Sequence, residues 1–269
     1  MSADKLVVVT GGGSGIGAAT AQRLRAQGFE VLITGRRRDV LERCAESIGA
    51  KFLVADVSLS GDNERVANEV RSIGLPLVGL VHAAGAMVAG TVEETSVTSW
   101  QRALDVNLTG PFLLTKELLP MLREGAGSIV MVASVAADRT PGGMAAYAVS
   151  KAALVALSNS LAVEEGSGPR SVRCNVVNPG WTRTEMADEE MREASEVLGG
   201  LDVEEAYLEV TKLVPLARPA EAIEVASVIT WLLSDDASYV NGASIAIDGG
   251  HRLIDAGAVP FEWALTKRH

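Results

Sequence analysis

Tyr147 and Lys151 lie four residues apart and carry side chains that could handle a proton together. They begin an Ala-rich run without glycine or proline until Gly166, which predicts a helix. On a helix, residues i and i+4 share one face, so the phenol and the ammonium would point the same way. A nearby cation favours the phenolate, and lowering its pKa by roughly two to three units needs about 3–4 kcal/mol. A surface tyrosine beside a solvated lysine would show the same spacing.

A glycine-rich turn follows the first predicted strand, an apolar and β-branched run over residues 6–9. Gly11, Gly15 and Gly17 would let the chain turn sharply, approach a pyrophosphate closely and pack the next helix against the strand. The N-terminus of that helix would offer unpaired N–H groups to the phosphates. Because these glycines lie between a strand and a helix, they indicate a dinucleotide-binding unit.

Together these features resemble the short-chain dehydrogenase/reductase family of the Tyr-x-x-x-Lys type. The matching motifs are Thr10-Gly11-x-x-x-Gly15-x-Gly17, Asp56-Val57, Ala84-Gly85, Asn107, Ser134, Tyr147-x-x-x-Lys151, and Asn178-Pro179-Gly180 with Thr184. They run in order over residues 5–250, nearly the whole chain. The resemblance implies an α/β fold: one Rossmann-like domain over residues 1–269, with a doubly wound sheet of about seven parallel strands flanked by helices.

The resemblance also implies four catalytic residues: Asn107, Ser134, Tyr147 and Lys151. Ser134 would donate to a carbonyl oxygen that becomes anionic as hydride arrives. Tyr147 would protonate that oxygen, or deprotonate the alcohol in reverse, while Lys151 lowers its pKa and holds the nicotinamide ribose. Asn107 would bend a helix over residues 96–122 and hold a water joined to Lys151. A serine hydrolase is the rival for Ser134, but no Gly-x-Ser-x-Gly surrounds it.

The residues expected to bind the cofactor follow the same motifs. They are Thr10, Gly11, Gly13, Ser14, Gly15, Ile16, Gly17, Arg36, Arg37, Asp56, Val57, Ala83, Ala84, Gly85, Tyr147, Lys151, Pro179, Gly180, Thr182 and Thr184. Asp56 would lie beside the adenine, although it could also cap the next helix. The chain departs from the family at His82-Ala83, where Asn-Asn is usual, which puts in doubt the hydrogen bonds that brace this strand. We expect His82 to be structural. Thr182 is a milder departure, from Ile or Val.

The end of the second strand, residues 30–34, indicates which cofactor is preferred. Gly35 stands where an acidic residue would bind the adenosine ribose of NAD, and Arg36 follows directly. A guanidinium can bind a 2′-phosphate that a carboxylate would repel. We therefore expect NADP(H) to be preferred, with NAD(H) possible. The alternative is a basic loop that only opens the next helix.

Residues 185–214 are expected to form the substrate lid, with Gly199-Gly200 as a hinge or helix break. The segment holds ten acidic residues: Glu185, Asp188, Glu189, Glu190, Glu193, Glu196, Asp202, Glu204, Glu205 and Glu209. They could disfavour anionic substrates or simply form a solvated helix face. Apolar residues of the lid suggest only a partly apolar pocket, so the carbonyl substrate stays open. Residues 251–269 form a tail that could cover this active site or a neighbour's.

Length and composition limit the classes of protein to which this chain can belong. A length of 269 residues suits one large α/β domain. The net charge of −10, with 24 scattered basic residues, argues against a nucleic-acid surface. No apolar run reaches about 18 residues and no signal peptide precedes the first strand, so we expect no membrane span. Cys44 and Cys174 suit a reduced cytoplasmic interior rather than a metal site. The family resemblance implies a homotetramer, with a dimer as second choice.

The sequence thus predicts an NADP(H)-preferring oxidoreductase that interconverts a ketone and a secondary alcohol, without a metal. One alternative is an NAD-dependent alcohol dehydrogenase on the same scaffold. Another is a non-catalytic, dinucleotide-binding regulatory protein. The set Asn107, Ser134, Tyr147 and Lys151 argues against the last, because a pure binder has no use for all four.

Overall fold

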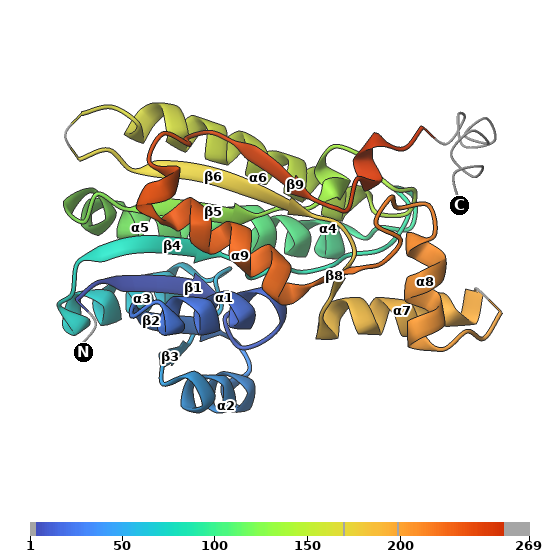
Figure 1. Cartoon of the computed structure of the whole chain (residues 1–269), viewed down its shortest axis with the longest axis horizontal. Helices are drawn as coiled ribbons and strands as arrows, with labels where there is room; N and C mark the ends of the chain where they lie inside the picture. The colour runs from blue at the N-terminus through green and yellow to red at the C-terminus, as the bar shows by residue number, and fades with distance from the viewer. Residues whose placement is uncertain (1–3, 169, 198, 256–269) are drawn as a thin grey trace.

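A parallel sheet forms the centre of the computed structural model, which describes residues 4–168, 170–197 and 199–255 (Figure 1). In sheet order its strands are β3 (Lys51–Val54), β2 (Glu30–Gly35), β1 (Leu6–Thr10), β4 (Leu77–His82), β5 (Ser128–Val132), β6 (Arg173–Pro179) and β9 (Ser244–Ile247). Every pairing between neighbours is parallel. The chain winds outward on both sides of β1, so β1 and β4 border the switch point where such folds bind ligands. The expected doubly wound sheet of about seven parallel strands is confirmed.

Helices cover both faces of this sheet. They are α1 (Gly15–Ala26), α2 (Arg38–Ile48), α3 (Ser60–Ile73), α4 (Val97–Leu104), α5 (Gly110–Glu124), α6 (Ala145–Glu165) and α9 (Ala222–Leu233). In β1, Val7 and Val9 pack in one core cluster with residues of α1 and α9, whereas Leu6 and Val8 pack in another with residues of α3 and α5. Because successive strand residues point to opposite faces, both layers together explain the uninterrupted apolar run.

The helix expected over residues 96–122 is broken in its middle. Helices α4 and α5 are joined by a π-helical turn, Asp105–Thr109, which holds Asn107. A π turn inserts one residue into a helix and shifts the side chains that follow. The buried Asn107 amide uses this position to bond the Ala86 backbone in both directions, at 2.8 and 2.9 Å. The break therefore ties the helix to the chain that leaves β4.

The segment expected to be the lid folds as two helices, α7 (Glu185–Val197) and α8 (Val203–Thr211), beyond one end of the sheet (Figure 1). Two short strands, β7 (Thr182–Arg183) and β8 (Ala220–Glu221), pair in parallel where the chain leaves and re-enters the body. Gly199 and Gly200 lie between the helices with φ of +89° and +84°, as a helix break requires. The predicted tail falls mostly on residues 256–269, outside the described residues.

Helix α6 is, within the described residues, the one helix long and apolar enough to cross a membrane. It packs against β6 and α4, and 44% of its most apolar window is buried inside the protein. Core helices of α/β proteins meet the same criterion of length and composition. We therefore interpret α6 as a helix of the core.

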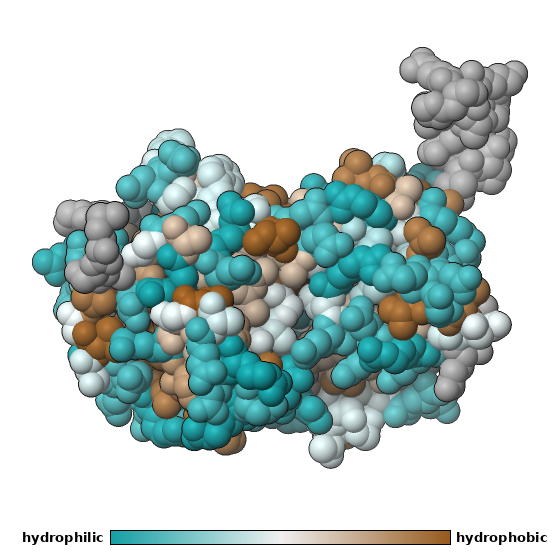
Figure 2. Space-filling model, turned by 60° about the horizontal axis from the view of Figure 1, so that its bottom comes forward, coloured by the Kyte–Doolittle hydropathy of each residue, from teal (hydrophilic) through white to brown (hydrophobic). Residues whose placement is uncertain are grey.

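On the face shown in Figure 2, hydrophobic residues occur in scattered groups among hydrophilic ones.

Candidate active site

A cavity of about 930 Å³ opens where the strands β1, β2, β4, β5 and β6 end. It extends from Arg36 and Arg37 at the end of β2, past the glycine-rich turn, to Ser134 and Tyr147. All the predicted catalytic and cofactor-binding residues line this cavity except Thr10 and Asn107, which lie behind its wall. The fold thus brings together side chains from six separate stretches of sequence.

Thr10 supports the wall at the point where the chain departs from the family pattern. Its hydroxyl accepts hydrogen bonds from the backbone N–H groups of Ala83 (3.2 Å) and Ala84 (3.1 Å). These bonds brace the end of β4 without an asparagine at position 83. The neighbouring His82 is buried and its Nε2 lies 2.9 Å from the Thr115 hydroxyl. Burial lowers the pKa of His82 to about 3, so it remains neutral, in agreement with a structural role.

The glycine-rich turn leaves no room for side chains. A Cβ on Gly17 would lie 2.2 Å from the Gly11 carbonyl oxygen, and one on Gly11 would lie 2.8 Å from the backbone of Ala83 and Ala84. Gly11 (φ +64°) and Gly15 (φ +52°) also adopt the left-handed region. Helix α1 begins at Gly15, and the Ser14 side chain makes no capping hydrogen bond to its first N–H groups. The turn therefore fits a pyrophosphate held by backbone donors.

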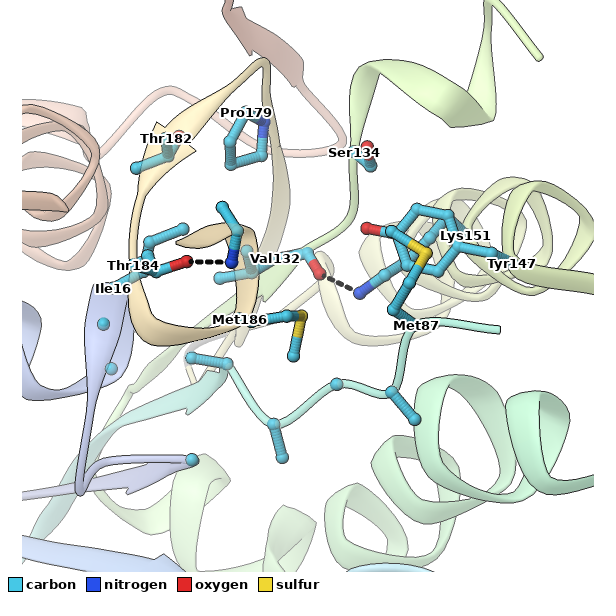
Figure 3. Close-up of a pocket in the computed structure, with 18 of the residues that line it drawn as sticks. Ile16, Met87, Val132, Ser134, Tyr147, Lys151, Pro179, Thr182, Thr184 and Met186 are labelled. Carbon is cyan, nitrogen blue, oxygen red and sulfur yellow. Dashed lines mark hydrogen bonds between the residues drawn. The ribbon is translucent and has the colours of Figure 1, made fainter. Parts of the chain in front are cut away.

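Ser134, Tyr147 and Lys151 lie at the other end of the cavity (Figure 3). The buried Lys151 Nζ donates to the Val132 carbonyl oxygen at 2.8 Å and lies 5.7 Å from the centroid of the Tyr147 ring. This hydrogen bond uses one of the three N–H bonds of the ammonium, which leaves donors for the hydroxyls of a ribose. Ser134 follows β5, and its hydroxyl accepts from the Ala136 N–H at 3.2 Å.

Asn107 acts on this group through Ser150. Its Nδ2 donates to the Ser150 hydroxyl at 2.9 Å, and that hydroxyl donates to the Tyr147 carbonyl oxygen at 2.7 Å. The chain of bonds fixes the first turn of α6 against the π-helical turn. Asn107 thus holds the backbone that carries Tyr147, a contact that sequence reasoning did not predict.

In the protein without its cofactor, the pKa of Tyr147 is raised rather than lowered, and the effect of Lys151 on it stays a prediction for the complex with the cofactor. Burial raises the pKa of Tyr147 to about 12, and only the Ser134 hydroxyl acts to lower it. Burial also lowers the pKa of Lys151 to about 8, because an ammonium is costly in the same apolar surroundings. Burial thus favours the neutral phenol of Tyr147.

At the β2 end, Arg36 and Arg37 line the cavity beside Gly35. The Arg37 Nη2 donates to the Ser14 hydroxyl at 3.1 Å and to Glu185 at 2.9 Å.

Asp56 also lines the cavity, and its carboxylate accepts from the N–H and hydroxyl of Ser58. Since the residue at the N-cap of α3 is Leu59, the helix-capping alternative for Asp56 is wrong.

The lid and the residues after β9 contribute cavity-lining groups whose places in the site the sequence did not show. Glu190 of α7 lies close enough to raise the pKa of Tyr147, and burial raises its own pKa to about 7. Arg139 donates to the Ile254 carbonyl oxygen at 2.7 Å, which holds residues 251–254 at the cavity. Met186 of the lid and His251 and Arg252 after β9 also line the cavity, as do Met87 after β4 and Met144 before α6. Helix periodicity alone could not show which face of α7 would turn toward Tyr147.

Of the two threonines in this loop, Thr184 supports the start of the lid. Its hydroxyl accepts from the Ala187 N–H at 3.2 Å and so caps the first turn of α7 (Figure 3). Its methyl would touch a Cβ on Gly15 at 3.0 Å. The start of the lid therefore packs directly on the glycine-rich turn.

This combination of fold and cavity defines an NAD(P)-dependent oxidoreductase. A family model described as enoyl-(acyl carrier protein) reductase matches residues 11–252. The chain belongs to the short-chain dehydrogenase/reductase family.

Relatives and solved structures span nearly the full chain. Protein MoaE of Klebsiella aerogenes is 37% identical, covering 96% of this chain and 99% of its own. Meso-2,3-butanediol dehydrogenase of Serratia marcescens is 34% identical, covering 94% and 96%. The crystal structure of a variant of actinorhodin polyketide ketoreductase with NADPH has a TM-score of 0.87 at 29% identity, covering 93% and 98%. Further relatives are named as an NADP-dependent (R)-specific alcohol dehydrogenase, from Lentilactobacillus kefiri, and as levodione reductase, from Leifsonia aquatica. Together with the family model they show that this chain is an NAD(P)-dependent oxidoreductase.

Proposed function

We propose that this protein is an NADP(H)-preferring oxidoreductase that interconverts a ketone and a secondary alcohol, with Tyr147 as the acid and base. The observation that supports this most is one continuous cavity. Its β2 end presents Arg36 and Arg37, and its other end presents Ser134, Tyr147 and Lys151. The glycine-rich turn between them lines the cavity and leaves no room for a side chain at Gly11 or Gly17, which suits the close approach of a dinucleotide.

When bound, the nicotinamide cofactor supplies or accepts the hydride. Ser134 would donate a hydrogen bond to the substrate oxygen, and Tyr147 would transfer its proton to that oxygen during reduction. A neutral phenol, with its pKa raised to about 12, is the form that donates a proton. The remaining donors of Lys151 would hold the ribose hydroxyls. Asn107 would position Tyr147 through Ser150. A water relay from Lys151 stays a prediction.

Replacing Tyr147 by Phe tests the chemical step. We expect kcat for NADPH-dependent ketone reduction to fall about a hundred- to ten-thousandfold, because the proton donor is lost. NADPH binding, measured by fluorescence, should change little. Tyr239→Phe is the matched control, since Tyr239 is fully exposed and does not line the cavity. Retention of kcat in Tyr147→Phe would exclude Tyr147 as the proton donor.

Replacing Gly35 by Asp tests the preference for NADP(H). A carboxylate at the end of β2 would repel a 2′-phosphate and bind ribose hydroxyls. We expect the ratio of kcat/KM for NADPH over NADH to fall by at least tenfold, on the order of 1.4 kcal/mol. An unchanged ratio would favour the alternative of an NAD-dependent alcohol dehydrogenase.

Three further expectations belong to the proposal. The protein would be one cytoplasmic domain over residues 1–269, act on a small molecule rather than on nucleic acid or a membrane, and form a homotetramer, or else a dimer. Methionine side chains at the substrate end favour a partly apolar ketone. Light scattering would measure the assembly, and a panel of ketones and alcohols would find the substrate. Cofactor binding without turnover of any of them would favour a non-catalytic binding protein.

A further inference from the structure

Arg37 joins three parts of the cavity that are distant in the sequence. It follows β2, bonds Ser14 of the glycine-rich turn at 3.1 Å, and pairs with Glu185 at 2.9 Å. Glu185 is the first residue of lid helix α7, 148 positions further along the chain. All three residues line the cavity. One guanidinium thus connects the nucleotide end of the site to the lid.

The Glu185 carboxylate uses the same donor that a 2′-phosphate would need. Arginine binds carboxylates and phosphates through the same fork of N–H groups. An acidic side chain in the first turn of α7 is also favoured by the helix dipole. A phosphate on the adenosine ribose would therefore meet a guanidinium that already has an anionic partner.

The pair is weak enough to be displaced. The side chains of Arg37 and Glu185 are 58% and 60% exposed, and ion pairs this exposed contribute little. A phosphate monoester carries a charge of about −1.5 to −2 at neutral pH, against −1 for a carboxylate. Arg36 makes no ion pair with any other described residue, so it can bind the phosphate without a competitor. Competition at Arg37 would thus reduce phosphate affinity without abolishing it.

We propose that Glu185 competes with the cofactor's 2′-phosphate for Arg37, so that the lid helix helps to set coenzyme selectivity. Binding of NADP(H) would release the first turn of α7 from Arg37, whereas NAD(H) would leave the pair in place. The inference rests on the proposed preference for NADP(H). It assigns a specificity role to a lid residue that has no place in the proton-transfer step.

Binding of two nucleotides without a nicotinamide tests this directly. Adenosine 2′,5′-bisphosphate and 5′-AMP differ only in the 2′-phosphate, and calorimetry gives the affinity of each for the wild type and for Glu185→Gln. We expect the substitution to tighten bisphosphate binding about two- to fivefold, as for loss of an exposed ion pair, and to leave 5′-AMP unchanged. Glu189→Gln is the matched control: Glu189 lies on the same helix, lines the cavity and does not pair with Arg37.

The gain should also disappear when Arg37 is replaced by Ala, because no guanidinium is then shared. Equal effects of Glu185→Gln and Glu189→Gln, or a gain that persists without Arg37, would overturn the inference and leave the NADP(H) preference intact. If the wild type bound both nucleotides equally, the proposed preference itself would fail, and this inference with it.

Discussion

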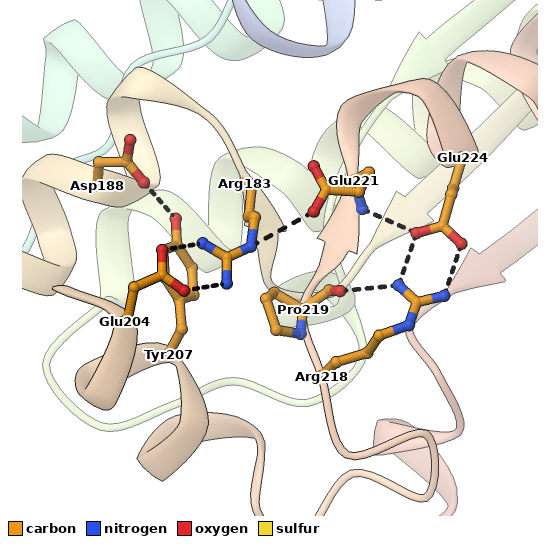
Figure 4. Close-up of polar contacts among 8 residues, drawn as sticks. All are labelled: Arg183, Asp188, Glu204, Tyr207, Arg218, Pro219, Glu221 and Glu224. Atoms are coloured by element: carbon orange, nitrogen blue, oxygen red, sulfur yellow. Dashed lines mark hydrogen bonds and ion pairs between the residues drawn. The ribbon is translucent and has the colours of Figure 1, made fainter.

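The glycine-rich turn and the lid border the same cavity but are held by different forces. In the turn, backbone meets backbone: the space beside Gly17 is filled by the Gly11 carbonyl, and Gly11 itself touches the chain after β4. In the lid, charged side chains add contacts to the body that the turn does not have (Figure 4). Arg183 forms two bonds with Glu204 of α8, at 2.5 and 2.6 Å, and reaches Glu221 of β8 at 3.4 Å.

A small apolar cluster supports the lid from within. The buried residues Ala187 and Met191 of α7 pack with Ala206 and Tyr207 of α8. The Tyr207 hydroxyl donates to Asp188 at 2.9 Å, and the Arg183 guanidinium lies 4.8 Å from the Tyr207 ring. The helices of the lid are thus joined firmly to each other, and ion pairs add to the contacts that attach them to the body. Such pairs can be exchanged at low cost, which suits a segment that must adapt to a substrate.

The largest effect is expected in the glycine-rich turn. Gly17→Ala places a Cβ 2.2 Å from the Gly11 carbonyl oxygen, so the backbone of the turn must move. We expect the free energy of unfolding to fall by about 1–3 kcal/mol and NADPH binding to weaken strongly. Denaturant unfolding and fluorescence titration measure the two effects.

Gly61→Ala is the matched control for that experiment. Gly61 is in α3, and a Cβ there would meet nothing within 4 Å. Alanine at this position should leave NADPH binding unchanged and keep or slightly raise stability. If both variants behaved alike, close backbone packing would not be what requires glycine in the turn.

A smaller effect is expected in the lid. Arg183→Ala removes the bonds to Glu204 and Glu221 and exposes the Tyr207 ring. We expect KM for the ketone to rise about fivefold, on the order of 1 kcal/mol, with little change in NADPH affinity. Arg218→Ala is the control. Arg218 also donates two hydrogen bonds to a carboxylate, but that carboxylate belongs to Glu224 of α9 rather than to the lid. An equal rise in KM for both variants would contradict a specific attachment of the lid.

The smallest effect concerns the pH dependence of alcohol oxidation. Above about pH 7 Glu190 is ionised, and its negative charge opposes formation of the Tyr147 phenolate. Glu190→Gln removes that charge, so the pKa of Tyr147 should fall. The alkaline rise of kcat/KM for oxidation should then begin at a pH lower by roughly a few tenths of a unit. Glu64→Gln is the control, since Glu64 is an exposed residue of α3 and does not line the cavity. A shift to higher pH would contradict this sign.

Much of the nucleotide half could be predicted from the sequence because its requirements are local. A glycine is needed where backbones touch, as at Gly11 and Gly17, or where φ is positive, as at Gly15, and the spacing of these glycines is visible in the order of residues alone. The apolar strands likewise predicted a sheet covered on both faces. The rest depended on the packed fold. Burial raises the pKa of Tyr147 in the protein without its cofactor, and the alternative that Asp56 caps α3 is wrong because that helix begins later.

By itself, the sequence determined the parallel sheet and the glycine-rich turn, since both follow from local spacing and from the alternation of strand and helix; its motifs also carried the resemblance to the family, which implied most of the site residues. Only the tertiary structure decided how the helix of the lid is turned, that Asn107 reaches Tyr147 through Ser150, and that Glu185 pairs with Arg37. These contacts join residues far apart in the chain. Their energies depend on distance and burial, which the packed fold fixes and the order of residues does not.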